Sequence, residues 1–196
     1  MERRLAEQFG ASLTAVREAL IELEAQGLVV RKRNSATHVV KLTPEDVDKI
    51  FRVRRALESL VVEEASRNAT PDRKQRLREV FEAMKDAAHA DASRTFNDGI
   101  LEFHQCLWDM ADNTYLVTAL ERTVLPYFMD RSVRLFSMES LQGEQANAYY
   151  RRVLDSHLEI LESIEAGGPE AARAAFDHAF DGWYRHAIVS DQPPSS

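Results

Sequence analysis

The sequence predicts a mainly α-helical protein, in which a small N-terminal helix-turn-helix with a wing precedes an all-α body. Residues 1–41 contain two short amphipathic segments, a glycine turn and a basic hairpin. Residues 42–190 instead repeat an apolar period of 3.6 residues with few helix breakers. At 196 residues the chain is long enough for one substantial core plus a small module. We therefore expect two domains with these boundaries and a disordered tail at residues 191–196.

The N-terminal module is expected to begin with two helices joined by a tight turn. The first, over residues 2–9, would end at Gly10 in a left-handed conformation. Ser12 or Thr14 would cap the second helix, and Arg17 would project from its first turns. Small hydroxyl groups and an arginine at a helix N-terminus suit the phosphates and base edges of a DNA major groove.

A hairpin with a basic tip is expected to complete the module as a wing. Residues 28–30 and 38–40 have strand character, and the charged turn Arg31-Lys32-Arg33-Asn34 lies between them. Residues 1–41 hold seven Lys or Arg against five Asp or Glu, a net charge of +2, whereas the remainder holds eighteen against twenty-seven, a net charge of −9. Only the N-terminal module therefore suits a polyanion. The alternative is a small amphipathic helical hairpin with a solvated basic tip.

Six helices are expected in the body. Thr43-Pro44 and Thr70-Pro71 mark two of the starts, because a capping hydroxyl precedes a first-turn proline. The expected helices span residues 44–69, 71–90, 93–111, 115–137, 144–166 and 169–189. Pro126 is expected to kink the fourth of them. On the first body helix, the residues expected to face the core are Val47, Ile50, Val53, Leu57, Leu60 and Val61.

Several classes of protein are not expected. No apolar stretch approaches the thickness of a bilayer and no signal-peptide core follows the charged start, so we expect a cytoplasmic protein with no membrane partner. Cys106, the single cysteine, cannot form an internal disulfide and is expected to fill the core. An enzyme is not expected, because the sequence has no Ser-His-Asp phrase, HExxH motif or phosphate-binding loop.

The phrases RRLAEQFG, VREAL and LEAQGLV, with the hairpin after them, resemble the winged-helix domain of GntR-type bacterial transcription regulators. The resemblance implies that operator DNA is contacted by Arg3, Ser12, Thr14, Arg17, Arg33 and Asn34. The sequence departs from the family pattern at Leu13, where most relatives carry arginine, and at Ala36, where the wing usually has glycine. The family's first helix, which would precede Glu2, is absent, so the winged helix is expected to be truncated.

Phrases of the body, FRVRRALE, EFHQCL, ADN and SHLEIL with AGGPEAA, resemble the C-terminal FCD domain of the FadR-like subfamily. This resemblance implies a six- or seven-helix bundle with a central cavity for a small carboxylate metabolite. It also implies a homodimer that places two winged helices on a palindromic operator. The implied function is a ligand-responsive transcription regulator, a repressor released by its metabolite. A helical ligand-binding or dimerisation protein that no longer binds DNA is the alternative.

The same resemblance implies an effector site at Arg54, Asn97, His104 and His157. Arg54 would clamp a carboxylate through two parallel hydrogen bonds, or would form an ordinary salt bridge to Glu58 one helical turn later. Four aromatic residues are expected to belong to the core rather than to a dedicated aromatic site: Trp108, Phe128, Tyr149 and Trp183.

A divalent metal ion, zinc-like or nickel-like, is the cofactor that the subfamily suggests. His104 and His157 match two of its four usual ligands, an aspartate and three histidines. The other two positions fall on Ile100 and Ala179, because His178 comes one residue early and one residue turns a helix by about 100°. Two readings stay open. Either Asn97, a water or a ligand carboxylate completes a metal site, or the two imidazoles are hydrogen-bonded and line a polar cavity without an ion.

Overall fold

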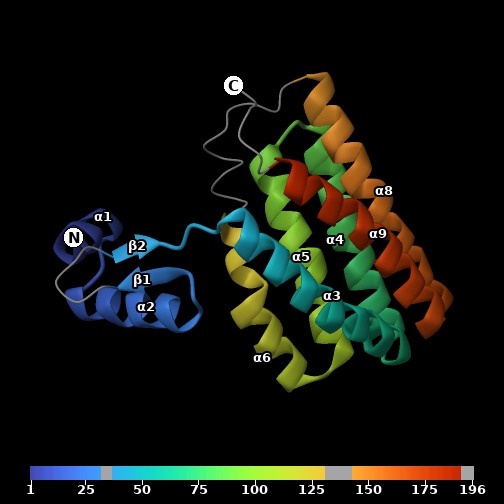
Figure 1. The fold of residues 1–196 in the computed structure, drawn as a ribbon, viewed down its shortest axis with the longest axis horizontal. Coiled ribbons are helices and arrows are strands. Elements are labelled where there is room, and N and C mark those ends of the chain that lie inside the picture. Colours follow the sequence, from blue (N-terminus) through green and yellow to red (C-terminus); the bar gives the residue numbers. More distant parts are fainter. Residues whose placement is uncertain (32–36, 131–142, 191–196) are drawn as a thin grey trace.

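The computed structural model describes residues 1–31, 37–130 and 143–190. Figure 1 shows a small N-terminal module joined by one extended connection to a larger helical body. The module contains α1 (Glu2–Phe9), α2 (Leu13–Ala25), β1 (Val29–Arg31) and β2 (Thr37–Val39). The helices of the body are α3 (Pro44–Arg67), α4 (Pro71–His89), α5 (Ser93–Ala111), α6 (Thr114–Thr123), α8 (Glu144–Ala166) and α9 (Pro169–Ser190). The mainly α fold with a small winged module is confirmed.

The winged module follows the local signals in its sequence. Gly10 ends α1 with a φ of 61°, a left-handed conformation that glycine adopts without steric cost. The Oγ of Ser12 accepts the backbone N–H of Ala15 over 3.1 Å, so Ser12 rather than Thr14 caps α2. The strands β1 and β2 pair antiparallel, with Val30 opposite His38. The tip of the wing lies outside the described residues.

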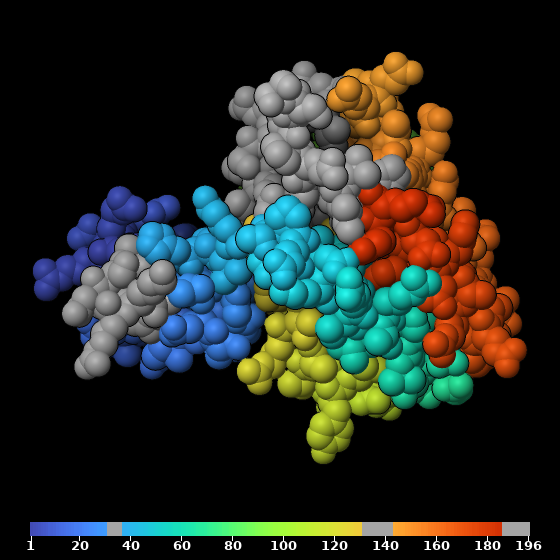
Figure 2. All heavy atoms as spheres, in the orientation of Figure 1, coloured from blue at the N-terminus to red at the C-terminus, as the bar shows by residue number. Residues whose placement is uncertain are grey.

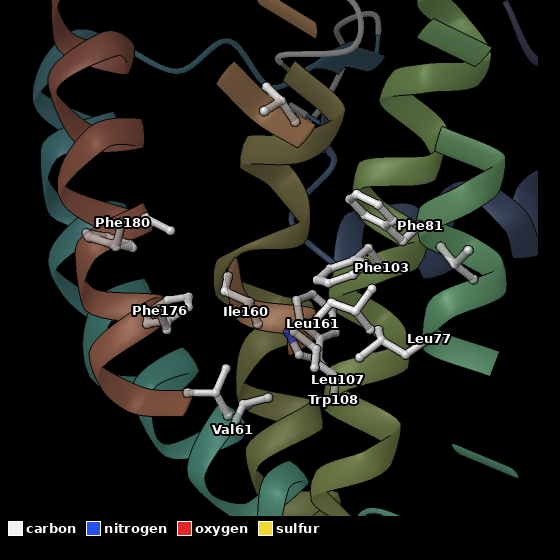
Figure 3. Packing of buried hydrophobic residues seen from close by; sticks show 14 of the residues in the cluster. Val61, Leu77, Phe81, Phe103, Leu107, Trp108, Ile160, Leu161, Phe176 and Phe180 are labelled. Atoms are coloured by element: carbon white, nitrogen blue, oxygen red, sulfur yellow. The ribbon is translucent and has the colours of Figure 1, made fainter. Parts of the chain in front are cut away.

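The body is a bundle in which α3 packs against α9 and α5, while α4 packs against α5 and α8. A capping box starts α3, because Thr43 accepts the N–H of Asp46 and the Asp46 carboxylate accepts the N–H of Thr43. Figure 3 shows buried side chains such as Leu107, Leu161 and Phe176 converging between the helices. This continuous apolar core holds the central helices at fixed positions.

The fourth body helix differs from the prediction. Residues 115–137 were expected to form one helix kinked at Pro126, but α6 ends at Thr123 and the chain turns at Val124 before residues 125–130 become helical again. Pro126 is therefore the second residue of a new helical segment, where its missing N–H leaves no helical hydrogen bond unmade. The rest of the predicted helix, from residue 131, lies outside the described residues.

The inward face of α3 also differs from the prediction. Val53 and Leu60 were expected to face the core, but they are 44% and 39% exposed. The buried stripe lies about one residue further round the helix and consists of Val47, Phe51, Arg54, Glu58, Val61, Val62 and Ala65, with two small serines beside it. Two charged side chains therefore occupy central positions of an otherwise apolar face.

The module lies close to the body next to the break after α6. Gly27, two residues after the end of α2, is near Pro126, since a Cβ atom at this position would lie 3.7 Å from Cγ of Pro126. In Figure 2 the blue module meets the body beside the yellow segment that contains α6. No helix among the described residues combines the length and apolar character needed to span a bilayer.

Candidate functional site

The first turns of α2 face outward. Ser12, Thr14 and Arg17 are exposed, and the Arg17 side chain remains 57% exposed although its Nε lies 2.9 Å from the Glu2 carboxylate. Arg3 is exposed on α1. All four side chains lie on the surface, and their contact with operator DNA stays a prediction. Arg33 and Asn34 of the predicted wing contact lie outside the described residues.

A buried polar cluster lies between α3 and α5. Arg54 and Glu58, one turn apart on α3, form an ion pair in which both side chains are at least 97% buried. The second partner of each is His104 of α5: Arg54 Nη2 lies 3.1 Å from its Nε2, and Glu58 Oε1 lies 2.9 Å from its Nδ1. The indole N–H of Trp108 donates to the same Oε1 over 3.2 Å. The three polar groups thus satisfy one another in the core.

The partners fix the protonation states of the cluster. Burial acts to raise the pKa of Glu58, but the charge of Arg54 and the hydrogen bonds from His104 and Arg54 outweigh it and lower the pKa to about 2. Burial lowers the pKa of His104, against the opposing charge of Glu58. At neutral pH the cluster therefore contains one positive guanidinium, one negative carboxylate and a neutral imidazole.

Aromatic rings enclose the guanidinium of Arg54. Its Cζ atom lies 4.8 Å from the ring centre of Phe128 and 5.2 Å from that of Trp183. The rings of three further residues lie within 6 Å, those of Phe51, Tyr127 and Phe180. A cation over an aromatic face is stabilised by about 0.5–2 kcal/mol. Phe128 and Trp183 thus contact the site, beyond the core role that the sequence predicted for them.

His157 of α8 lies next to this cluster. Its ring centre is 5.5 Å from that of His104 and 5.2 Å from that of Trp183. The Nδ1–H donates to the carbonyl of Val153 over 2.8 Å, because a carbonyl oxygen can only accept. Burial is the largest cause that lowers the pKa of His157, to about 3. Its Nε2 is consequently a buried lone pair with no partner among the described residues.

The residues present do not fit a divalent metal site. Both ring nitrogens of His104 are engaged by Arg54 and Glu58, and the positions of the two missing ligands hold Ile100 and Ala179. The side chain of His178 is 77% exposed and pairs with Glu159 on the outside of the bundle, as its position one residue early predicts. Among the described residues, no group of three or more metal-ligating side chains of this kind is present.

Asn97, the remaining predicted effector residue, is placed elsewhere. Its amide N–H donates to the Ser93 carbonyl over 2.7 Å, and its Oδ1 accepts the Tyr149 hydroxyl over 2.8 Å. Seven residues along a helix are about 10 Å, which separates Asn97 from His104. The structure brings together Arg54, His104 and His157, and not Asn97.

Three comparisons connect the chain to known proteins. Residues 1–39 match the family described as bacterial regulatory proteins, gntR family, and residues 49–182 match the FCD domain. The "Probable D-xylose utilization operon transcriptional repressor" of Paenarthrobacter nicotinovorans is 30% identical over 177 residues, which are 90% of this chain and 74% of that protein. The gluconate operon transcriptional repressor of Bacillus licheniformis is 23% identical, covering 92% and 72% of the two chains.

The structure of E. coli McbR/YncC superposes with a TM-score of 0.83 at 21% identity, covering 98% of this chain and 87% of that one. At this identity the superposition shows a shared fold. The comparisons favour a regulator over a helical ligand-binding protein that does not bind DNA.

Proposed function

Because the chain belongs to the GntR family of bacterial regulatory proteins and is thus a DNA-binding transcription regulator, we propose that it represses an operon and leaves the operator when a small carboxylate binds in the helical body. The observation that carries the operator contact is the exposure of Thr14 and Arg17 on the first turns of α2. The winged module, residues 1–41, carries a net charge of +2, whereas the whole chain carries −7. Affinity for phosphates is therefore concentrated in this module. Such a protein acts in the bacterial cytoplasm, where the chromosome lies.

A DNA-binding measurement tests the proposed contact between the winged module and operator DNA. Fluorescence anisotropy with palindromic DNA from upstream of the protein's own operon would compare the wild-type chain with Arg17→Ala. Loss of a base or phosphate contact is expected to weaken specific binding by about tenfold or more. Arg151→Ala, an exposed arginine on α8, is the matched control and should bind as the wild type does. Equal operator affinity for both variants would count against the α2 assignment.

The effector is proposed to bind at the Arg54, His104 and His157 cluster. The guanidinium of Arg54 supplies positive charge, and the N–H groups that Glu58 and His104 do not use would donate to a carboxylate. The Nε2 of His157 is buried without a partner, and a hydroxyl on the ligand would satisfy it in either protonation state, because a hydroxyl both donates and accepts. A carboxylate that also carries hydroxyl groups therefore suits the cluster better than a simple fatty acid or a neutral sugar.

A short path of neighbouring residues leads from this cluster to the winged module. Phe128 lies against both Arg54 and His104, with its ring centre 5.3 Å from that of His104. Pro126, two residues earlier in the chain, faces Gly27 of the module. A ligand bound beside Arg54 would thus press on Phe128 and shift the segment next to the module. For such a shift to release DNA, the ligand must prefer the arrangement with low operator affinity.

Two probes taken from the names of the relatives test the effector class. Gluconate carries a carboxylate and hydroxyl groups, whereas D-xylose carries hydroxyl groups alone. Gluconate is expected to raise the apparent Kd for operator DNA, and D-xylose to leave it unchanged. Release by D-xylose alone would refute the carboxylate anchor, and loss of gluconate release in His157→Gln would support the hydroxyl contact.

The protein is proposed to bind the palindrome as a homodimer, because one winged module contacts one half-site. Analytical ultracentrifugation of the free protein and of its operator complex measures this stoichiometry. A complex of one chain per palindrome would contradict it. Arg17→Ala should leave the oligomeric state of the free protein unchanged.

A further inference from the structure

Both histidines of the cluster are held as metal-ligating histidines usually are. The Nδ1–H of His104 donates to Glu58, and the Nδ1–H of His157 donates to the Val153 carbonyl. A carboxylate or carbonyl acceptor at one ring nitrogen fixes the tautomer and leaves the lone pair on the other. The two Nε2 atoms are therefore the ones that a cation in this cluster would contact.

A cation that belongs to the protein already contacts one of them. Arg54 Nη2 lies 3.1 Å from His104 Nε2, and it donates to that lone pair because a guanidinium has only donors and stays protonated. A zinc ion would have to approach the same nitrogen to about 2.1 Å. We infer that the guanidinium of Arg54 is the resident cation of this cluster and excludes a divalent metal ion, so that the regulator works without a metal.

The surroundings of Arg54 hold the guanidinium in place. Glu58 pairs with the Nε of Arg54, and five aromatic rings lie within 6 Å of the guanidinium. Moving the guanidinium away would leave the Glu58 carboxylate buried without its counter-charge, which is strongly unfavourable. A metal ion therefore cannot replace Arg54 by a simple side-chain rotation.

The two positions where the subfamily has its other metal ligands offer no replacement ligands. Ile100 lies one turn before His104 on α5, and Ala179 lies one turn before Trp183, whose ring is 5.4 Å from that of His104. Both positions present hydrocarbon where an ion needs oxygen or nitrogen. This inference is independent of the proposed function, because metal binding is measured without DNA or effector.

Metal titration of the wild-type protein is the first test. After treatment with EDTA and dialysis, the protein is titrated with Co²⁺ and Zn²⁺ by calorimetry, with visible absorption recording the Co²⁺ coordination. We expect no stoichiometric site and no Co²⁺ band that depends on His104 or His157. One bound equivalent that disappears in His104→Ala would overturn the inference, whether or not the protein also binds DNA.

A matched pair of variants assigns the exclusion to Arg54. The first variant, Ile100→Asp with Ala179→His, supplies the two missing ligands and retains Arg54. The second adds Arg54→Met, which frees Nε2 of His104 and leaves Glu58 to balance the ion. The second is expected to bind one equivalent of Co²⁺ with an absorption band, at least tenfold more tightly than the first. If both variants fold, as circular dichroism records, and bind Co²⁺ equally well or equally poorly, Arg54 is not the excluding group.

Discussion

Removal of the Arg54 charge should destabilise the fold more than removal of any single exposed ion pair. In Arg54→Met the side chain keeps most of its length and apolar volume, but Glu58 stays 1% exposed with no cation beside it. Breaking a buried pair by deleting one partner costs about 3–5 kcal/mol. For a chain of this size that corresponds to a fall in Tm of roughly 6–20 °C, at about 2–4 °C per kcal/mol.

A double variant, Arg54→Met with Glu58→Gln, separates the loss of charge compensation from the loss of side-chain packing. His104 and Trp108 both donate to Oε1 of Glu58, an oxygen that Glu58→Gln retains. Each single variant leaves one buried charge unpaired, whereas Arg54→Met with Glu58→Gln leaves none. The double variant should therefore cost about as much as one single variant, a coupling energy on the order of 3 kcal/mol.

Urea unfolding at pH 7, followed by circular dichroism, measures the free energy of unfolding of four proteins. They are the wild type, the two single variants and the double variant. Folding lowers the pKa of Glu58 from 4.5 to about 2, so the contribution of its ionised form is complete above pH 4.5 and is lost as the pH falls toward 2. At pH 7 the pair is fully charged in the wild type. Single-variant costs that add within about 0.5 kcal/mol would refute the reasoning, because independent sites behave in that way.

Three further predictions concern the Thr43 cap of α3, the pKa of His157, and Pro126, which lies next to the winged module. Thr43→Ala removes the α3 cap and should cost about 1 kcal/mol in urea unfolding, whereas an unchanged midpoint would mean that the capping box contributes nothing. Because folding lowers the pKa of His157 from 6.5 to about 3, wild-type stability should fall as the pH drops below 6.5, and His157→Gln should reduce this slope by up to about 1.4 kcal/mol per pH unit. Pro126→Ala should leave operator affinity within about twofold but weaken release by gluconate, and unchanged release in anisotropy would exclude this path.

The sequence was sufficient for the elements that local chemistry determines. A hydroxyl before a proline at Thr43 and Thr70 placed two helix starts, and Gly10 placed the end of α1, because caps depend on a few neighbouring residues. The break after α6 was predicted only as a kink at Pro126. A proline limits the preceding helix, but whether the chain bends or restarts depends on packing against distant residues.

The face of α3 shows why the candidate site was only partly predictable. Apolar periodicity favoured Val53 and Leu60, because a stripe containing Arg54 and Glu58 places two charges in the core. The spacing of four between these charges was visible, yet it is equally typical of an exposed helix pair. What decides the outcome is His104, fifty residues away from Arg54, which bonds to both charged groups. The residues that sequence reasoning missed, Phe128 and Trp183, likewise reach the cluster from other helices.

Effector binding to this cluster should be linked to proton uptake. The charged and titratable groups that face it are Arg54 and Glu58 from α3, His104 from α5 and His157 from α8, and their charges sum to zero at pH 7. A carboxylate ligand adds a negative charge to this buried, neutral set, and a negative neighbour raises the pKa of an imidazole. The free energy of adding the charge is lowest if one histidine takes up a proton.

This linkage fixes the direction of a pH effect on ligand binding. The apparent affinity for gluconate, measured by calorimetry, should increase as the pH falls from 8 toward 6, by at most about tenfold per pH unit for one proton. The heat of binding should also vary with the ionisation enthalpy of the buffer, because a proton is taken from it. His157→Gln removes the imidazole that has a free Nε2 and should flatten the profile, whereas His178→Gln, which changes only an exposed histidine, should not. An affinity that is independent of pH in the wild type would mean that the ligand's carboxylate displaces Glu58 from Arg54, or binds outside this cluster.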